Sequence, residues 1–77
     1  MTGLVDLTRR LTGMRIRGKH RNWRILQVRV ADHHLTVQFD RAKSSFTIDL
    51  PNEFDGSNVE HIAWLLPQIE RWLSSHA

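Results

Sequence analysis

The fold is decided by residues 26–39, which read LQVRVADHHLTVQF. Apolar and polar side chains alternate on both sides of Asp32-His33, and this period of two predicts two β-strands. Asp and His tolerate the positive φ that a two-residue hairpin loop requires, so we place the loop at these two residues. The inward side chains then pair as Val30 with Leu35, Val28 with Val37 and Leu26 with Phe39. The segment therefore predicts an antiparallel hairpin with one apolar face.

A third strand is predicted downstream of this hairpin. Phe46, Ile48 and Leu50 alternate with polar residues, and Pro51 ends the run because it cannot donate a ladder hydrogen bond. A four-residue loop over 41–44 connects this strand to the hairpin. In that register Phe39 lies opposite Phe46, and Val37 lies opposite Ile48.

A further strand is predicted upstream of the hairpin. Met14 and Ile16 alternate with Arg15 and Arg17, ahead of a loop at 19–22. The chain therefore contains three or four consecutive strands joined by short loops, which is the pattern of an antiparallel meander.

A short amphipathic helix is expected over residues 3–12, before the first strand. Leu4, Leu7 and Leu11 recur at helical spacing. Thr2 suits the N-cap, and Gly13 suits the left-handed position that follows a last helical turn.

A longer helix is expected to start near Asn58, where Ser57-x-x-Glu60 has the spacing of a capping box. Its apolar stripe consists of Val59, Ile62, Leu66, Ile69 and Leu73, widened by Leu65 and Trp72. Pro67 lies inside this run, where it removes one backbone hydrogen bond and predicts a kink. The stripe predicts that this helix lies across the apolar face of the sheet.

The predicted fold is α+β, in the order α-β-β-β-β-α. It has a short N-terminal helix, an antiparallel three- to four-stranded meander, and a long C-terminal helix packed on one face. With 77 residues the chain has room for one hydrophobic core, so we expect a single small domain over 1–77. Such a core contributes about 3–5 kcal/mol, and a domain of this size gains stability from a partner or from forming a dimer.

The charged residues are segregated along the chain. Residues 1–30 carry a net charge of +7, and residues 31–77 carry −4. This asymmetry is typical of a protein that binds a polyanion with one side. The chain has no cysteine, and its longest apolar run, residues 62–66, is much shorter than the roughly 20 residues of a membrane span. We therefore expect a cytoplasmic protein that does not enter a membrane.

Few residues are arranged for catalysis or metal binding. The sequence has no glycine-rich phosphate loop and no His-x-x-x-His spacing. Glu60-His61 lies in the first turn of the predicted long helix, where Glu60 is expected to cap. His33-His34 lies at the hairpin tip, and adjacent strand residues point to opposite faces. We expect no enzymatic activity, no cofactor and no metal site.

The arginine-rich first half of the chain predicts a nucleic-acid-binding surface. The expected binding residues are Arg15, Arg17, Lys19, Arg21, Trp23, Arg24 and Arg29. Strand parity places Arg15, Arg17, Ile25, Gln27 and Arg29 on the sheet face away from the long helix, where Thr36, Gln38 and Thr47 add neutral hydrogen-bonding groups. Arginine forms bidentate phosphate contacts, and an exposed Trp23 ring offers a platform for stacking a base of DNA or RNA. In the alternative interpretation, the first helix covers Trp23 and Ile25, and the arginines are only solvated.

Two acidic residues leave a second function open. Asp40 and Asp49 are expected on the same sheet face as the arginines. That face is then bipolar, and it suits a protein partner of mixed charge as well as it suits a nucleic acid. In this alternative the chain is a small inhibitor, an adaptor or an accessory subunit.

Trp64 lies beside the apolar stripe of the long helix, on the side that carries Arg71. An exposed aromatic beside an arginine is typical of an interface, so we predict that Trp64 and Arg71 contribute to one. A homodimer through this helix is one form of that interface. The alternative is that the helix is buried broadly enough to cover Trp64.

The element order resembles that of two families. An α-β-β-β-α order is similar to the double-stranded-RNA-binding domain, which contacts phosphates with a basic start to its second helix, whereas this chain has Asp55, Asn58 and Glu60 there. Residues 14–75 are similar in architecture to the single-strand-binding transcriptional coactivators, which dimerise through a helix. Neither resemblance includes a specific motif, so neither assigns a family.

Overall fold

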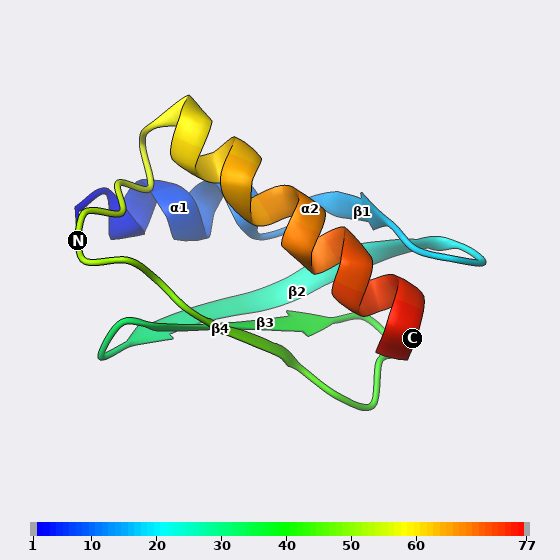
Figure 1. The fold of residues 1–77 in the computed structure, drawn as a ribbon. Coiled ribbons are helices and arrows are strands. Elements are labelled where there is room, and N and C mark those ends of the chain that lie inside the picture. Colours follow the sequence, from blue (N-terminus) through cyan, green and yellow to red (C-terminus); the bar gives the residue numbers. More distant parts are fainter. Residues whose placement is uncertain (1, 77) are drawn as a thin grey trace.

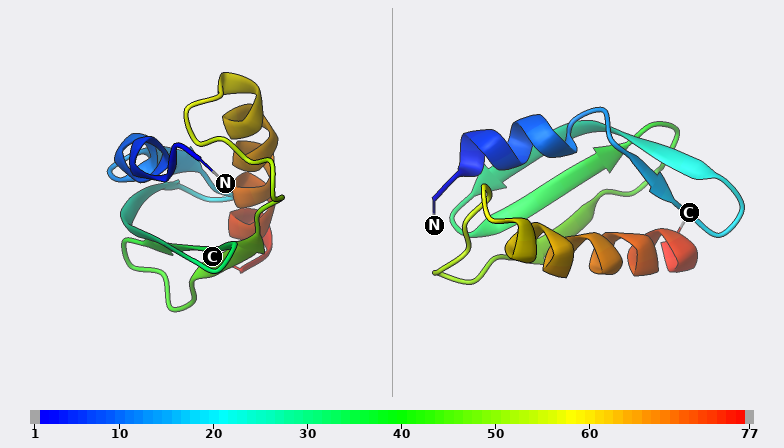
Figure 2. Two further views of the ribbon diagram at one scale, coloured as in Figure 1. Left: turned by 90° about the vertical axis from the view of Figure 1, so that its left-hand side faces the viewer. Right: turned by 90° about the horizontal axis from the view of Figure 1, so that it is seen from above.

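The computed structural model describes residues 2–76 and confirms the predicted order of elements (Figure 1). The elements are α1 (Leu4–Leu11), β1 (Arg15–Arg17), β2 (Asn22–Ala31), β3 (His34–Phe39), β4 (Phe46–Asp49) and α2 (Val59–His76). The four strands form one antiparallel sheet in the order β1-β2-β3-β4. Both helices lie on the same side of this sheet, as Figures 1 and 2 show. The opposite side, called the outer face below, is left uncovered by helices.

The hairpin between β2 and β3 turns at the predicted residues. Asp32 and His33 have φ values of 47° and 67°, which is the left-handed pair that a type I′ turn requires. Val30 lies opposite Leu35 and Val28 opposite Val37, and both pairings were predicted. The turn therefore fixes the register of the central strands.

The prediction that Leu26 lies opposite Phe39 is wrong. A β-bulge between Ile25 and Gln27 inserts one extra residue, and Ile25 becomes the partner of Phe39. Ile25 is 1% exposed, whereas Leu26 is 44% exposed. The bulge reverses the parity of the strand before it, so Trp23 and Ile25 point into the core together with Val28.

The predicted register between β3 and β4 is also wrong, by two residues. Val37 lies opposite Phe46 and Leu35 opposite Ile48, because the connection runs from residue 40 to residue 45 rather than over 41–44. A shift of two preserves the alternation of faces, so Phe46 still points into the core.

Helix α1 buries Leu7 and Leu11 completely. Its N-cap is Gly3 rather than Thr2, because the chain enters the helix with a φ of 65°, which glycine adopts without a steric penalty. Thr2 instead forms a bridge to Asp55. Gly13 has the predicted left-handed conformation after the last turn, with a φ of 86°.

Helix α2 starts one residue after Asn58, whose Oδ1 accepts a hydrogen bond of 2.8 Å from the backbone N–H of Glu60. Asn58 is therefore the cap, and the predicted capping role of Ser57 is wrong. The hydroxyl of Ser57 donates to Asp55 Oδ1 instead, at 2.7 Å.

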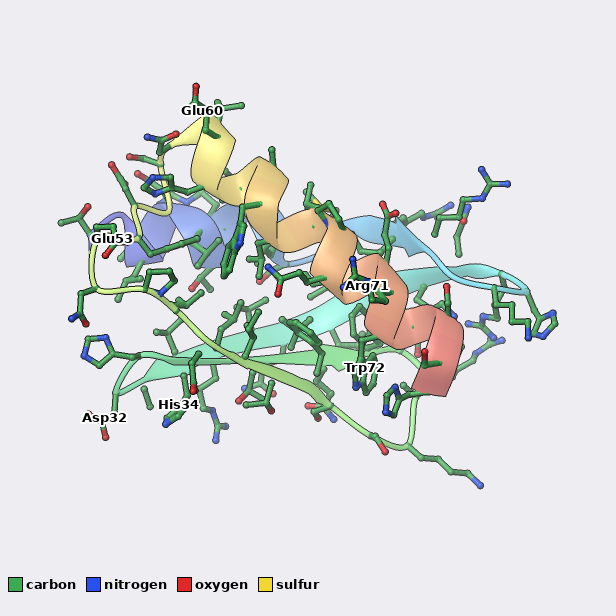
Figure 3. The ribbon with its side chains drawn as sticks, viewed as in Figure 1. Asp32, His34, Glu53, Glu60, Arg71 and Trp72 are labelled. Atoms are coloured by element: carbon green, nitrogen blue, oxygen red, sulfur yellow. The ribbon has the colours of Figure 1, made fainter. Side chains whose placement is uncertain are left out.

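One face of α2 completes the core. Its fully or nearly fully buried residues are Ile62, Leu65, Ile69 and Leu73, while Val59 is 69% exposed and was wrongly placed in the stripe. Trp72 points from α2 towards the sheet (Figure 3) and stacks on Phe39 with ring centroids 5.8 Å apart. Pro67 lies within the helix, as the sequence requires. Among residues 2–76 no polar or charged residue is buried, but the core includes one buried polar atom without a hydrogen-bond partner, the indole Nε1 of Trp23.

Candidate nucleic-acid interface

The pairing of β1 with β2 brings two arginines together on the outer face. Arg15 lies directly opposite Arg24, and both side chains are exposed. The next pair along the two strands, Ile16 and Trp23, points into the core. Like charges directly opposite each other on antiparallel strands destabilise a sheet. The edge of this sheet therefore carries a repulsion that a bound anion would relieve.

These arginines belong to a larger group that lines one shallow hollow, called the arginine hollow below. It has a volume of about 300 Å³, and its lining residues are Arg15, Arg21, Asn22, Arg24, Asp40 and Arg41. The backbone N–H of Asp40 donates to the carbonyl of Arg24 at 2.9 Å, and this bond holds the turn after β3 against the start of β2. Four guanidinium groups and one carboxylate thus share a single site.

Arg41 is the member that the sequence analysis missed. It lies in the acidic half of the chain and in the predicted loop over 41–44, which connects the hairpin to the following strand. Its left-handed backbone, with a φ of 68°, turns the chain back at the end of β3. The hairpin register itself contained the signal, because the end of an antiparallel strand lies beside the start of its partner, which here carries Arg24.

The arginines of this hollow have no carboxylate within ion-pair distance. Across the described part of the chain the single side-chain contact between a basic nitrogen and a carboxylate joins His34 Nδ1 and Asp49 Oδ1, at the opposite end of β3. Figure 3 shows His34 beside Asp32 at that hairpin end. Six residues of strand separate the two ends by roughly 20 Å, so this pair does not neutralise the arginines.

The outer face continues from the arginine hollow along β2 and β3. A second hollow of about 200 Å³ is lined by Gln27, Arg29, Thr36, Gln38 and Ser45. Arg29 and the predicted neutral hydrogen-bonding groups therefore do lie on this face. Ile25 does not, because the bulge turns it inward.

Trp23 is not a stacking platform, and that expectation is corrected. Its ring is 8% exposed, and the guanidinium carbon of Arg21 lies 4.3 Å from the ring centroid. Gly18 lies so close that a Cβ there would be 2.6 Å from the indole Nε1. The interpretation in which Trp23 and Ile25 are covered is therefore right about these two residues, while Arg15 and Arg24 remain on the open face.

Arg17 and Lys19 are not brought into the arginine hollow. Arg17 lines a different hollow, of about 390 Å³, with Gly18, Pro67, Glu70, Arg71 and Ser74. The reason is that α2 packs against β1, the edge strand, so the end of this strand faces the flank of the helix. Lys19 is exposed in the connection between β1 and β2.

The two residues predicted to share an interface on α2 also lie apart. Arg71 lines the hollow beside Arg17, and Trp64 lines another hollow near the start of the helix. Trp64 is 43% exposed, which excludes the interpretation in which α2 is buried broadly enough to cover it.

Two further observations on the described residues concern metal binding and membrane spans. Residues 2–76 contain no cluster of three His, Cys, Asp or Glu side chains placed to hold a metal ion. No helix in the same range has the length and apolar character needed to cross a membrane. Comparison with protein-family models, curated proteins and solved structures gives no match. The function is therefore argued from the chain's own residues.

Proposed function

We propose that this protein binds nucleic acid, without catalysing a reaction, through the outer face of its sheet. The contacts would come from Arg15, Arg21, Arg24 and Arg41 in the arginine hollow, with Arg29 farther along the same face. The observation that carries the proposal is that these four guanidinium groups share one open hollow and have no ion-pair partner. A cytoplasmic location, expected from the composition, belongs to the same proposal.

Phosphate groups are the ligand that this arrangement suits. Guanidinium groups donate paired hydrogen bonds to phosphate oxygens, and each neutralised phosphate releases condensed counterions. A phosphate between Arg15 and Arg24 also removes the repulsion between these directly opposed side chains. Phosphate binding would thus offset a like-charge repulsion between two exposed side chains.

The same geometry predicts little discrimination between bases. The exposed large apolar side chains within residues 2–76 are Val5, Leu26, Val59 and Trp64, and no aromatic ring among them lies on the outer face. Without a stacking platform, contacts to phosphate dominate, and such contacts carry no sequence information.

A titration against short single- and double-stranded oligonucleotides over a range of salt concentrations tests this proposal. One phosphate contact for each of the four arginines in the hollow predicts that the logarithm of the binding constant falls against the logarithm of salt concentration with a slope of about −2.8 for single strands and about −3.6 for double strands. A contact from Arg29 would steepen the slope by about 0.7 to 0.9 more. Absence of binding at about 50 mM salt, where such contacts are strongest, contradicts the proposal.

A second candidate is a protein partner of mixed charge on the same face. Asp40 lies within the arginine hollow, and Asp49 lies at the far end of the face beside His34. A partner with complementary acidic and basic groups would contact both ends. In that case oligonucleotides would bind weakly or not at all, so the same titration separates the two candidates.

A further inference from the structure

The hollow around Trp64 lies at the end of the molecule away from the arginine hollow. It has a volume of about 380 Å³ and is lined by Pro51, Glu53, Phe54, Glu60, His61 and Trp64. Figure 3 shows Glu53 on the loop and Glu60 on the first turn of α2, at the same end of the molecule. We call this site the aromatic hollow.

The two partly exposed rings of this hollow, Trp64 and His61, pack against the buried ring of Phe54. Phe54 is 2% exposed, and its ring centroid lies 6.2 Å from that of Trp64 and 5.6 Å from that of His61. The buried ring therefore supports two partly exposed rings in a fixed arrangement. Preorganised rings of this kind bind a ligand with little loss of side-chain entropy.

The charge of the hollow is negative. Glu53 and Glu60 are exposed and form no ion pair within residues 2–76, and the lining residues, all from the described segment 51–64, include no lysine or arginine. His61 Nδ1 accepts a 2.8 Å hydrogen bond from the backbone N–H of Asp55. The hollow is therefore lined by two acidic residues and by no lysine or arginine.

The partial positive charge at the N-terminus of α2 repels a cation, but it is smaller than the charge of the two carboxylates. The helix dipole places about half a positive charge at the N-terminus, and this charge acts only within the first turn. Glu60 lies in that turn and offsets it, and Trp64 lies one turn farther along. The hollow as a whole therefore favours a positively charged ligand.

We propose that the aromatic hollow binds the guanidinium or ammonium group of an arginine or lysine in a short basic segment of a partner protein. A cation over the face of a tryptophan is attracted by the ring, and the two carboxylates complement its charge. The volume is at the lower end of the range for small-molecule pockets, which fits one side chain better than a larger ligand.

A second copy of this chain is a poorer occupant of the hollow than a partner protein. The arginines of the arginine hollow lie at the other end of the molecule, so a second copy that docked through them would bind head to tail. Head-to-tail contacts close into rings only at particular angles and otherwise grow into filaments. The proposal goes beyond nucleic-acid binding and does not depend on it, because it concerns different residues.

The test is a titration of the full chain with a short, capped peptide in which glycine and arginine alternate, followed by the indole N–H signal of Trp64. The control peptide carries citrulline, which is neutral and similar in shape, at each arginine. We expect the arginine peptide to shift the Trp64 signal and the citrulline peptide to leave it unchanged. Equal binding of the two peptides overturns the proposal.

Substitutions show which residues bind the arginine peptide. Trp64→Leu should weaken peptide binding about five- to thirtyfold, and Glu53→Gln combined with Glu60→Gln should weaken it further, whereas Val59→Ala on the same helix should not change it. Arg15→Gln with Arg24→Gln should leave peptide binding intact, which separates this site from the arginine hollow. Wild-type affinity in Trp64→Leu contradicts the proposal, and so does self-association of the wild-type chain that Trp64→Leu abolishes.

Discussion

The arginine hollow and the aromatic hollow are built in different ways. The first is an open part of the sheet where the charges come from three strand ends and loops, and its one tryptophan, Trp23, is buried beneath it. The second lies between a loop and a helix, has two carboxylates, and leaves its tryptophan, Trp64, 43% exposed. The charge asymmetry of the sequence thus becomes two separate surfaces, one lined mainly by arginines and one lined by two acidic residues.

The largest effect that tests this comparison is expected from the arginine hollow. Replacing Arg15, Arg24 and Arg41 together by Gln should weaken oligonucleotide binding about a thousandfold at about 50 mM salt, since each phosphate contact contributes about tenfold there. The salt slope should become shallower by about two to three. Fluorescence anisotropy with a labelled oligonucleotide measures both quantities.

The matched control for this variant removes the same charge elsewhere. Arg9→Gln, Arg10→Gln and Arg71→Gln change exposed residues on the two helices, and the combined variant has the same net charge as the first. It should bind nearly as the wild type does. If both triple variants lose equal affinity, binding depends on net charge and not on the arginine hollow.

The next effect compares the two tryptophans. Trp23→Leu should lower the free energy of unfolding by about 2–4 kcal/mol, because it leaves a cavity beneath Arg21 and Gly18. The folded variant should retain its oligonucleotide affinity. Trp64→Leu should change stability by less than about 1 kcal/mol, because that ring is partly exposed.

Urea denaturation followed by circular dichroism measures these free energies. Loss of oligonucleotide affinity in Trp23→Leu with unchanged stability would show that the ring acts as a stacking platform after all.

Substitutions at two glycines test the packing of Trp23 against Gly18, and the expected changes in stability are smaller. Gly18→Ala should destabilise the fold by about 1–3 kcal/mol, because the added Cβ would lie 2.6 Å from atoms of the Trp23 indole. Gly13→Ala meets nothing within 4 Å, and only its φ of +86° opposes it, for about 1 kcal/mol. Thermal unfolding of the two variants compares them. Equal destabilisation would indicate that Trp23 is not held against Gly18.

The smallest effect is a pH dependence near the aromatic hollow. Hydrogen bonds from the Ser57 side chain and backbone, followed by weaker contributions from Thr2 and His61, hold the pKa of Asp55 below its ordinary value of 3.8. A lowered pKa in the folded state means that the ionised carboxylate stabilises the fold above about pH 4. This contribution is lost as the pH falls through the lower, folded-state pKa.

Denaturation midpoints measured between about pH 2 and pH 6 test this effect. Asp55→Asn should remove this part of the pH dependence, whereas Asp6→Asn, on the exposed side of α1, should retain it. An unchanged pH profile in Asp55→Asn would show that the Ser57 hydrogen bonds do not favour the ionised form.

The fold could be predicted largely from hydrophobic periodicity and turn chemistry. The Asp32-His33 turn and the pairing of Val28 with Val37 follow from the alternation of one hairpin. The β-bulge was not predicted, although the sequence contains a sign of it. Ile25 alternates in step with Trp23, whereas the adjacent Leu26 alternates in step with Val28. The extra residue lets the strand bury both Ile25 and Val28. The stability gained by burying both side chains comes from packing in the core, which the alternation of a single strand does not reveal.

The candidate site was predicted less completely. Arg15, Arg21, Arg24 and Arg29 were expected on one surface, and the structure places the first three in one hollow and the fourth on the same face. Arg41 was missed although the register of the predicted hairpin already placed it beside Arg24. Trp23 was misjudged because burial of a ring depends on the bulge and on the close approach of Gly18, and neither can be recognised from the local alternation.

The central claim is that the outer face binds nucleic acid at the arginine hollow. The most direct test records the backbone amide spectrum of the isotope-labelled protein while a short single-stranded oligonucleotide is added at low salt. The account predicts that the amide signals of Arg15, residues 21–24 and residues 40–41 shift first, and that those of residues 53–64 stay in place. Shifts confined to residues 53–64, or no shifts at all, would contradict it.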